Sequence, residues 1–353
     1  MGKLAVYKYF SFMILVITLL MALFTIAGLF GGNANPTHET AIAMIVYALP
    51  IFIIGDLIVL TFWLIRRRWH WAAIPAVVLI SCIPYIGTIF QLGLFQSEPD
   101  NKSGFKVASY NVAMFGREIT GFKAEDILSE MKRQNVDILC LQEYMEHSGD
   151  RINSEKYKAY FTYGMAKGHD DMVIFSRFPI KNSGDIDFGG PTNNSAMWAD
   201  IDVGGKLVRV FNVHLETTGF NRTMRKVAKL QMKGAQIEDN AIIKAVYGDY
   251  TRGMVVRSMQ ADLVARHIRE SAHPAVVCGD FNDVPYSYTY NVMKGDLVDG
   301  FKECGSGFMK TFRGSKLVRI DYILHDEALS GKGYYKLDIS YSDHYPVFMT
   351  LSY

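Results

Sequence analysis

The chain has 353 residues, half of them hydrophobic, which is enough for one sizeable domain and an additional module. Its 37 basic and 35 acidic residues nearly balance, so the overall charge does not indicate a protein that binds polyanions over its whole surface. The four cysteines include no Cys-x-x-Cys pair, which argues against a zinc knuckle, and Cys140 and Cys278 are expected to be small buried apolar residues.

Three apolar segments come first along the chain. They cover about residues 9–30, 41–65 and 71–92, and each is long enough to cross a bilayer, which takes about 20 residues of helix. A cleaved signal peptide is the alternative for the first segment, but two more apolar segments follow it. The sequence therefore predicts a membrane anchor over residues 1–96 with three transmembrane helices.

Basic residues predict the orientation of this anchor. Lys3 and Lys8 precede the first segment and Arg66–Arg68 joins the second to the third, whereas the loop 33–40 has neither lysine nor arginine. By the positive-inside rule the N-terminus is cytoplasmic, so that after three crossings the rest of the chain is extracytoplasmic, either periplasmic or extracellular. Asp56 lies at mid-membrane depth, where it is either functional or hydrogen-bonded to a serine or threonine of a neighbouring helix.

The pattern changes after a polar linker predicted at residues 97–104. Helical spacing of apolar residues predicts helices around 124–131 and from near Gly253 to His267. Short β-rich runs predict strands at residues 105–112, 136–143, 171–176, 196–203, 207–215, 274–280, 319–324 and 346–352. Many strands with few helices indicate packed sheets that helices cover on their outer faces.

Polar residues collect where these predicted strands end. They are amides, carboxylates and histidines, and they recur in the order Asn111, Glu143, Asn212, His214, Asp280, Asn282, Asp321, Asp343 and His344. Each one alone has an ordinary explanation as a turn, cap or solvated loop residue. If the strand ends converge, the set offers oxygen ligands for Mg²⁺, amide donors and two imidazoles, a combination that suits hydrolysis of a phosphorus ester. No Gly-x-Ser-x-Gly elbow occurs, which disfavours a serine hydrolase.

The motifs around these residues resemble those of the endonuclease/exonuclease/phosphatase superfamily, which has the deoxyribonuclease I-like fold. In chain order they are SYNV, LQE, VIFSRFPI, NVHL, GDFND, RIDYIL and SDHYPV. The resemblance covers residues 105–353, the predicted catalytic domain. It implies an α/β fold, a four-layer α/β/β/α sandwich with the site at one edge of the paired sheets.

The resemblance also implies a metal site. Glu143 would be the principal ligand of Mg²⁺, with Mn²⁺ as the alternative ion, and Asn111 would lie beside it. Asp343 would lie near the metal or the leaving group. Asp283 follows the motif, but a turn or cap role is expected for it.

Five catalytic residues follow from the same resemblance. Asp280 would orient or deprotonate the attacking water, and Asn282 would hold water and phosphate. His214 would donate to the phosphate. His344 would stabilise the five-coordinate phosphorus, and Asp321 would pair with it.

A long insert, residues 216–251, separates the NVHL motif from the helix predicted near Gly253, and basic residues predominate in it. One interpretation is a solvated helical cover; the other is a basic lid that faces anionic headgroups or a phosphorylated substrate. Arg225 and Lys229 from this insert, with Asn212 from the preceding strand, are the predicted substrate contacts.

Three functions compete. The favoured one is a membrane-anchored phosphoesterase that acts on a lipid-linked or headgroup phosphate, because tethering raises the local concentration of lipid substrates. A nuclease acting on DNA or RNA is less favoured, since no groove of aromatic and basic residues is evident. A non-catalytic binding module is disfavoured because buried polar groups cost stability unless they are used. No protein partner is predicted.

Overall fold

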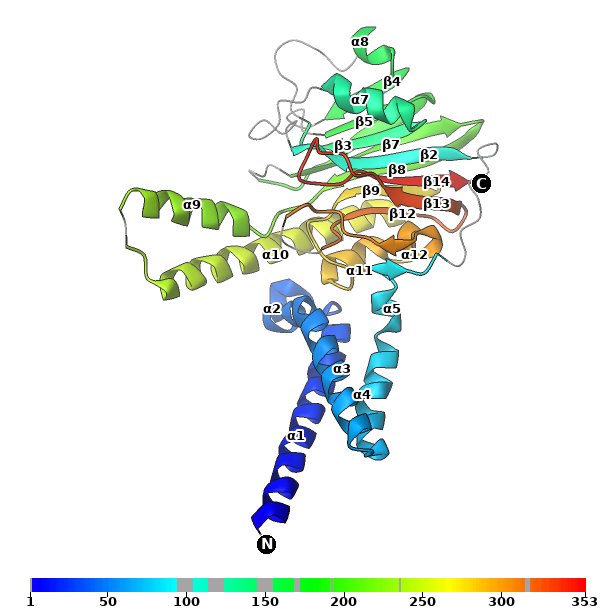
Figure 1. The fold of residues 1–353 in the computed structure, drawn as a ribbon. Coiled ribbons are helices and arrows are strands. Elements are labelled where there is room, and N and C mark those ends of the chain that lie inside the picture. Colours follow the sequence, from blue (N-terminus) through cyan, green and yellow to red (C-terminus); the bar gives the residue numbers. More distant parts are fainter. Residues whose placement is uncertain are drawn as a thin grey trace. The chain divides into compact units, whose positions relative to one another are not determined.

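The computed structural model of the chain divides into two compact units, one comprising residues 1–88 and 285–291 and the other residues 89–284 and 292–353 (Figure 1). The residues that it describes are 2–93, 104–113, 124–144, 155–167, 172–190, 192, 194–234, 236–314 and 318–353. Of the predicted linker, only Gly104 lies within these ranges.

The first unit is helical. Three of its helical stretches are long and apolar enough to cross a membrane, and they cover Val6–Gly31, Pro36–Ile65 and Trp69–Ile86. The second stretch begins earlier than predicted because Asn35 caps it, its side chain accepting a hydrogen bond from the Thr37 amide. The elements are α1 (Gly2–Gly31), α2 (Pro36–Met44), the 3₁₀ helix η1 (Ile45–Ala48), α3 (Leu49–Ile65), α4 (Trp69–Ser81) and α5 (Ile83–Ile86).

Two polar contacts join α1 to α3. Asp56 is fully buried, and its Oδ2 accepts a hydrogen bond from Thr25 Oγ1 at 2.5 Å. The indole of Trp63 donates to Thr18 Oγ1 at 2.9 Å. Hydrogen bonds of this kind hold apolar helices together. These contacts therefore support the interpretation that Asp56 is hydrogen-bonded to a threonine of a neighbouring helix.

The second unit contains two six-stranded sheets packed face to face. Sheet 1 has the order β10-β12-β9-β8-β7-β6, with bounds Val298–Asp299, Asp321–His325, Ala275–Asp280, Lys206–His214, Ser195–Val203 and Ile180–Ile186. Sheet 2 has the order β13-β14-β2-β3-β5-β4, with bounds Ser330–Lys336, Val347–Ser352, Phe105–Asn111, Ile138–Gln142, Met172–Ser176 and Tyr163–Lys167. A small third sheet pairs β1 (Phe90–Gln91) with β11 (Gly307–Phe308).

Helices cover the outer faces of the two large sheets, which confirms the predicted four-layer α/β/β/α sandwich (Figure 1). On sheet 2, α7 buries Ile127, Leu128 and Met131 in the second core cluster. The helices described after β1 are α7 (Ala124–Arg133), α8 (Glu155–Lys158), α9 (Phe220–Met232), α10 (Asp239–Arg269), α11 (Tyr288–Lys294) and α12 (Gly300–Cys304).

The predicted elements differ from the observed ones mainly at the edges. Among the described strands absent from the prediction, the three longest, β4, β6 and β13, are all edge strands. An edge strand carries polar and glycine residues and lacks a continuous apolar face, so its sequence gives a weak strand signal. The helix expected near Gly253 begins instead at Asp239. No residue before Gly253 in this helix is fully buried, so its first half lacks the strong apolar face that would have predicted it.

Gly279 sets the approach of β9 to β8. Its φ is 148°, and a Cβ there would lie 1.9 Å from the carbonyl oxygen of Val213. Only glycine allows the two parallel strands to pair this closely. The resulting register puts His214 opposite Asp280.

Candidate active site

Six of the predicted side chains meet where the strands of both sheets end. Sheet 1 contributes three of them, from β8, β9 and the start of β12, and sheet 2 contributes three from β2, the residue after β3 and the segment before β14. In that order they are His214, Asp280, Asp321, Asn111, Glu143 and His344. The site is therefore divided equally between the two sheets.

Asn111 connects the two halves. Its Nδ2 lies 3.1 Å from Glu143 Oε1 in its own sheet and 3.1 Å from Asp280 Oδ2 in the other. Its Oδ1 accepts a hydrogen bond from the Ala113 amide. Only 1% of Asn111 is exposed, so the amide that contacts both carboxylates is itself shielded from bulk water.

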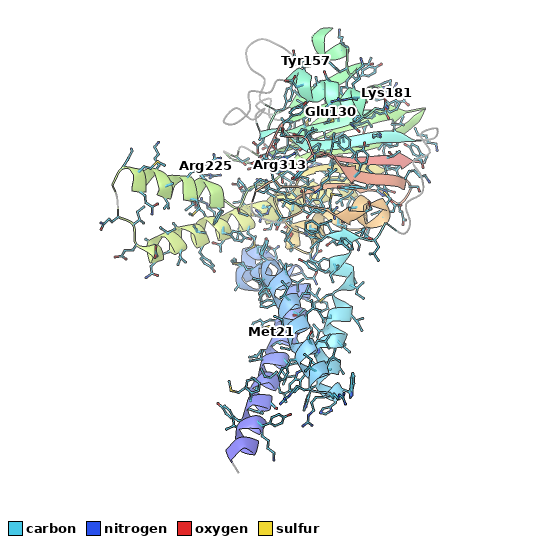
Figure 2. All side chains as sticks on the ribbon, viewed as in Figure 1. Met21, Glu130, Tyr157, Lys181, Arg225 and Arg313 are labelled. Carbon is cyan, nitrogen blue, oxygen red and sulfur yellow. The ribbon has the colours of Figure 1, made fainter. Side chains whose placement is uncertain are left out.

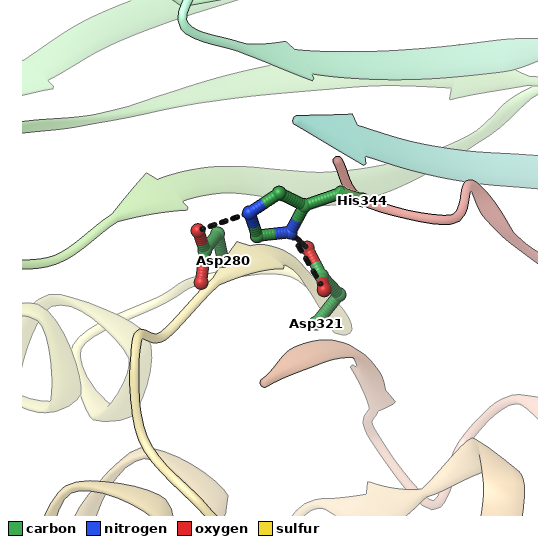
Figure 3. Close-up of side chains that lie close together, drawn as sticks. All are labelled: Asp280, Asp321 and His344. Atoms are coloured by element: carbon green, nitrogen blue, oxygen red, sulfur yellow. Dashed lines mark hydrogen bonds and ion pairs between the residues drawn. The ribbon is translucent and has the colours of Figure 1, made fainter. Parts of the chain in front are cut away.

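His344 lies between two aspartates (Figure 3). Its Nδ1 is 3.1 Å from each carboxylate oxygen of Asp321, and its Nε2 is 3.7 Å from Asp280 Oδ2. Burial disfavours the imidazolium, but the negative charges of Asp321 and then Asp280 outweigh it and raise the pKa of His344 to about 10. The ring is therefore a cation at neutral pH, hydrogen-bonded to Asp321 through Nδ1 and ion-paired with Asp280 through Nε2.

The loop after β9 orients Asp280. The amide of Asn282 donates to Asp280 Oδ1 at 2.8 Å, and Asn282 Nδ2 donates to Leu215 O at 2.9 Å and contacts Asp280 Oδ2 at 3.3 Å. Burial raises the pKa of Asp280, the charge of His344 opposes the rise, and the charge of Asp321 adds to it. A carboxylate with a raised pKa is a stronger base than an ordinary one, as a group that accepts a proton from water requires.

Glu143 faces solvent more than its neighbours do. Its side chain is 33% exposed, and His214 Nε2 lies 3.6 Å from its Oε1 and 4.0 Å from Asp280 Oδ2. The backbone of Glu143 has φ 52°, and so does that of Asn282. Such left-handed conformations cost about 1–3 kcal/mol each and cluster at functional sites, because the surrounding structure must enforce them.

A cation fits beside Glu143 better than among the buried residues. Asp280, Asp321 and His344 present atoms within 4.8 Å of one another. A protonated His344 offers no lone pair, however, so these three form an ion-pair network. Glu143 presents a partly exposed carboxylate, and the amide oxygen of Asn111 keeps a second lone pair, which are the hard oxygen donors that Mg²⁺ prefers.

Asp343 is exposed, and its Oδ1 lies 3.4 Å from the Ser342 hydroxyl. Its charge adds to the rise in the pKa of His344 after the larger effects of burial, Asp321 and Asp280. Its predicted place near the metal or the leaving group stays a prediction.

The structure corrects the expected role of Asn212. Its side chain is fully buried, and Nδ2 donates to Leu141 O and to Val173 O, both at 2.9 Å. Its Oδ1 accepts from Gln142 Nε2 at 2.7 Å. These partners belong to sheet 2 whereas Asn212 belongs to β8 of sheet 1, so the amide joins the sheets and is not available to a substrate.

Arg225 and Lys229 lie outside the six-residue cluster. Both are exposed on α9, which with the first half of α10 extends away from the sheets (Figure 2). We name residues 220–248 the helical arm.

A buried ion pair that was not predicted from the sequence supports the site. Arg257 Nε lies 3.0 Å from Asp283 Oδ2, and its Nη1 donates to Glu216 O at 2.8 Å, so α10 holds both the loop after β9 and the segment after β8. Both side chains are almost fully buried. Its position in the sequence could have indicated this burial. Arg257 lies three residues after Met254 and four before Ala261, so helical spacing puts it on the same buried face of α10.

Comparisons with known proteins identify related sequences and structures. The model of the Endonuclease/Exonuclease/phosphatase family matches residues 108–344, and that of a domain of unknown function (DUF8431) matches residues 11–89. No curated protein matches the chain.

Solved structures share the fold. An endonuclease/exonuclease/phosphatase from Bacteroides vulgatus is 17% identical over 71% of this chain and 99% of its own, with a TM-score of 0.52. The D. rerio TDP2 humanized by 14 mutations is 15% identical over the same shares of the two chains, with a TM-score of 0.51.

Proposed function

The chain belongs to the Endonuclease/Exonuclease/phosphatase family, and from this premise we propose that it is a membrane-anchored, Mg²⁺-dependent phosphoesterase acting on a lipid-linked or headgroup phosphate. One observation carries the proposal. Carboxylates, amides and imidazoles from both sheets converge at one end of the sandwich, with hydrogen bonds running from Glu143 through Asn111 to Asp280.

The chemistry is hydrolysis by in-line attack of water on phosphorus. Asp280 accepts a proton from the attacking water, while the hydroxyl forms the new bond to phosphorus and the bond to the alcohol oxygen breaks. The alkoxide takes a proton from solvent, and Asp280 returns its own proton there. The imidazolium of His344, held by Asp321, stabilises the negative charge that develops on the phosphoryl oxygens. His214 donates to the same group, and Asn282 keeps Asp280 oriented.

Glu143, with Asn111 beside it, would hold Mg²⁺ or, as the alternative, Mn²⁺. When bound, the ion supplies positive charge that neutralises the phosphoryl oxygens.

Three apolar helices support the anchoring. The basic residues at their ends support a cytoplasmic N-terminus and a catalytic unit outside the cytoplasm, periplasmic or extracellular. A catalytic unit tethered in this way meets lipid substrates at a high effective concentration.

The helical arm supports contact with anionic headgroups. It combines six basic residues with two acidic ones, and it exposes large apolar side chains, among them Met232 at 87% and Ile243 at 65%. Basic and apolar residues together on an exposed helix are typical of binding at a membrane interface. Arg225 and Lys229 would act there, on the headgroup region of the substrate or its neighbours.

The test is a substrate comparison with the full chain in lipid nanodiscs. We expect Mg²⁺-dependent release of phosphate or headgroup from a phospholipid extract, abolished by EDTA, with a rate reduced about 10²–10⁴-fold in Asp280→Asn. Cleavage of duplex DNA or RNA without lipid turnover would instead assign a nuclease. Absence of any turnover and of metal binding would leave a binding module.

A further inference from the structure

A cavity of about 650 Å³ opens at the base of the helical arm. Its lining comes from α10, from Arg222 of α9, from the segment after β8 and from the segment after β6. Small-molecule sites in proteins have volumes of roughly 300–1,000 Å³, so the cavity has the size of a ligand pocket. None of the six residues of the active site lines it.

The cavity begins next to the active site. Glu216 lines it and follows His214 by two residues, which span at most about 7 Å of extended chain. The amide of Glu216 donates to Gln260 Oε1 at 2.7 Å, and its carbonyl oxygen accepts from Arg257 Nη1 at 2.8 Å. These buried contacts with α10 fix the cavity wall relative to the strand end that carries His214.

One wall of the cavity is apolar. Val256, Met259 and Leu263 line it from successive turns of α10, and Phe188 adds an aromatic ring. Met259 is 60% exposed, and Val256 and Leu263 are half-buried. Core packing therefore leaves this apolar surface open.

The charged residues of the cavity neutralise one another. Arg222 Nη2 lies 3.6 Å from Glu216 Oε1, and Arg252 Nη2 lies 2.5 Å from Asp249 Oδ1. The lining contains two arginines and two acids and has no net charge. A pocket for a polyanion needs an excess of cations, so this one favours an uncharged occupant.

We infer that the cavity binds the apolar alcohol portion of the substrate while the phosphate lies among the active-site residues. The inference rests on the proposed phosphoesterase function and adds the substrate class, an ester of a long-chain apolar alcohol. The polar alcohol portion of a sugar or nucleoside ester would not cover the apolar side chains of the α10 wall.

The test measures how kcat/KM depends on alkyl chain length. The full chain in phosphatidylcholine nanodiscs is supplied with Mg²⁺ and with two series of substrates from ethyl to octyl, the monoalkyl phosphates and the alkyl methyl phosphates. We expect kcat/KM to rise about fourfold for each added methylene in at least one series, because each buried methylene contributes a similar increment. A flat profile in both series overturns the inference.

Two adjacent valines provide matched variants. Val256 lines the cavity, whereas Val255 is also half-buried on α10 but does not line it. We expect Val256→Gln to lower the octyl-to-ethyl ratio of kcat/KM at least tenfold, and Leu263→Gln to do the same, while Val255→Gln keeps the wild-type ratio. Equal ratios in all three variants would contradict the assignment.

Calorimetry with alkyl phosphonates separates this inference from the proposed function, because their P–C bond is not hydrolysed. We expect affinity to rise with chain length in the wild type and to lose that dependence in Val256→Gln. If this result holds but no ester is hydrolysed, the phosphoesterase function fails and the cavity assignment stands. If esters are hydrolysed but phosphonate affinity is independent of chain length, only the cavity assignment fails.

Discussion

Both carboxylate oxygens of Asp321 lie 3.1 Å from Nδ1 of His344. The contact fixes the orientation of the imidazole, directs its other nitrogen toward Asp280, and favours the protonated ring. In the proposed mechanism the charge of this ring depends on Asp321, which need not touch the substrate.

Asp321→Asn should move the alkaline limb of the pH–rate profile to lower pH. His344 must be protonated to stabilise negative charge, so activity is lost as pH rises through its pKa, which Asp321 helps to raise to about 10. Without that carboxylate the pKa of His344 falls and the loss comes earlier. Asp343→Asn is the matched control, with a smaller shift expected because Asp343 contributes less to the pKa of His344. An alkaline limb unchanged in Asp321→Asn would disprove the pairing role.

Glu143→Gln should weaken metal binding more than any other substitution at the site. We expect the Mg²⁺ concentration for half-maximal activity to rise more than about 100-fold in Glu143→Gln, and about 10–100-fold in Asn111→Ala because Asn111 positions the ligand. Mn²⁺ binding followed by electron paramagnetic resonance gives a readout independent of turnover. Glu327→Gln removes an exposed carboxylate elsewhere and is the control. Unaltered Mn²⁺ affinity in Glu143→Gln would exclude the proposed metal site.

Asn212→Ala should reduce activity although Asn212 lies away from solvent. The substitution leaves Leu141 O, Val173 O and Gln142 without their partner, which costs about 1–3 kcal/mol in the free energy of unfolding. We expect kcat to fall at temperatures where the protein remains folded, because the two sheets lose a fixed contact near the site. Asn182→Ala, on the exposed edge strand β6, is the control. Normal kcat in Asn212→Ala would argue against this role.

Arg257→Met should destabilise the catalytic unit strongly. It leaves the carboxylate of Asp283 buried without its cation, and breaking a buried pair in this way costs about 3–5 kcal/mol. The additional change Asp283→Asn should recover part of that loss, since no buried charge then remains. The exposed pair of Arg252 and Asp249 gives the comparison, because Arg252→Met should cost at most about 1 kcal/mol. Thermal unfolding of the full chain measures all three, and equal losses for Arg257→Met and Arg252→Met would contradict the prediction.

Arg225→Gln combined with Lys229→Gln should weaken contact of the helical arm with anionic lipid. All four native cysteines are buried, so a dye attached through Met232→Cys reports on the arm. We expect its emission to shift to the blue when phosphatidylglycerol replaces phosphatidylcholine in the nanodisc, and the double variant or high salt to reduce that shift. A dye at Lys206→Cys, at the exposed start of β8, should not respond. A lipid-independent signal at position 232 would exclude the arm as a membrane contact.

The sequence was informative where strands are buried on both faces. β9 is buried at all six positions, and its apolar run was recognised together with the polar residues at its end. The edge strands β4, β6 and β13 are not evident from the sequence. Each has solvent in place of a neighbouring strand on one side, so it can carry polar residues where a central strand needs apolar ones. The start of α10 was misplaced for a related reason, since half of this helix is outside any core.

Strand-end spacing predicted which polar residues would gather, and the structure brings six of them together, although their catalytic roles stay predictions. Spacing could not distinguish a residue that faces the substrate from one that joins the two sheets. Asn212 and His214 are two residues apart and therefore point to the same face of β8. Asn212 nevertheless lies between the sheets, and His214 lies at the site. Arg257 was missed because a single arginine in a helix is usually solvated, and only its tertiary partner Asp283 explains its burial.

The equal division of the site between two sheets has a consequence for inactivation. Glu143 and Asp280 belong to different sheets, so their separation changes whenever one sheet slides over the other. A displacement of about 1 Å at reacting groups can lower a rate by about a hundredfold. Heating would therefore abolish activity by letting the sheets slide over each other while every strand is still intact. The enzyme would lose activity at a lower temperature than the one at which it unfolds.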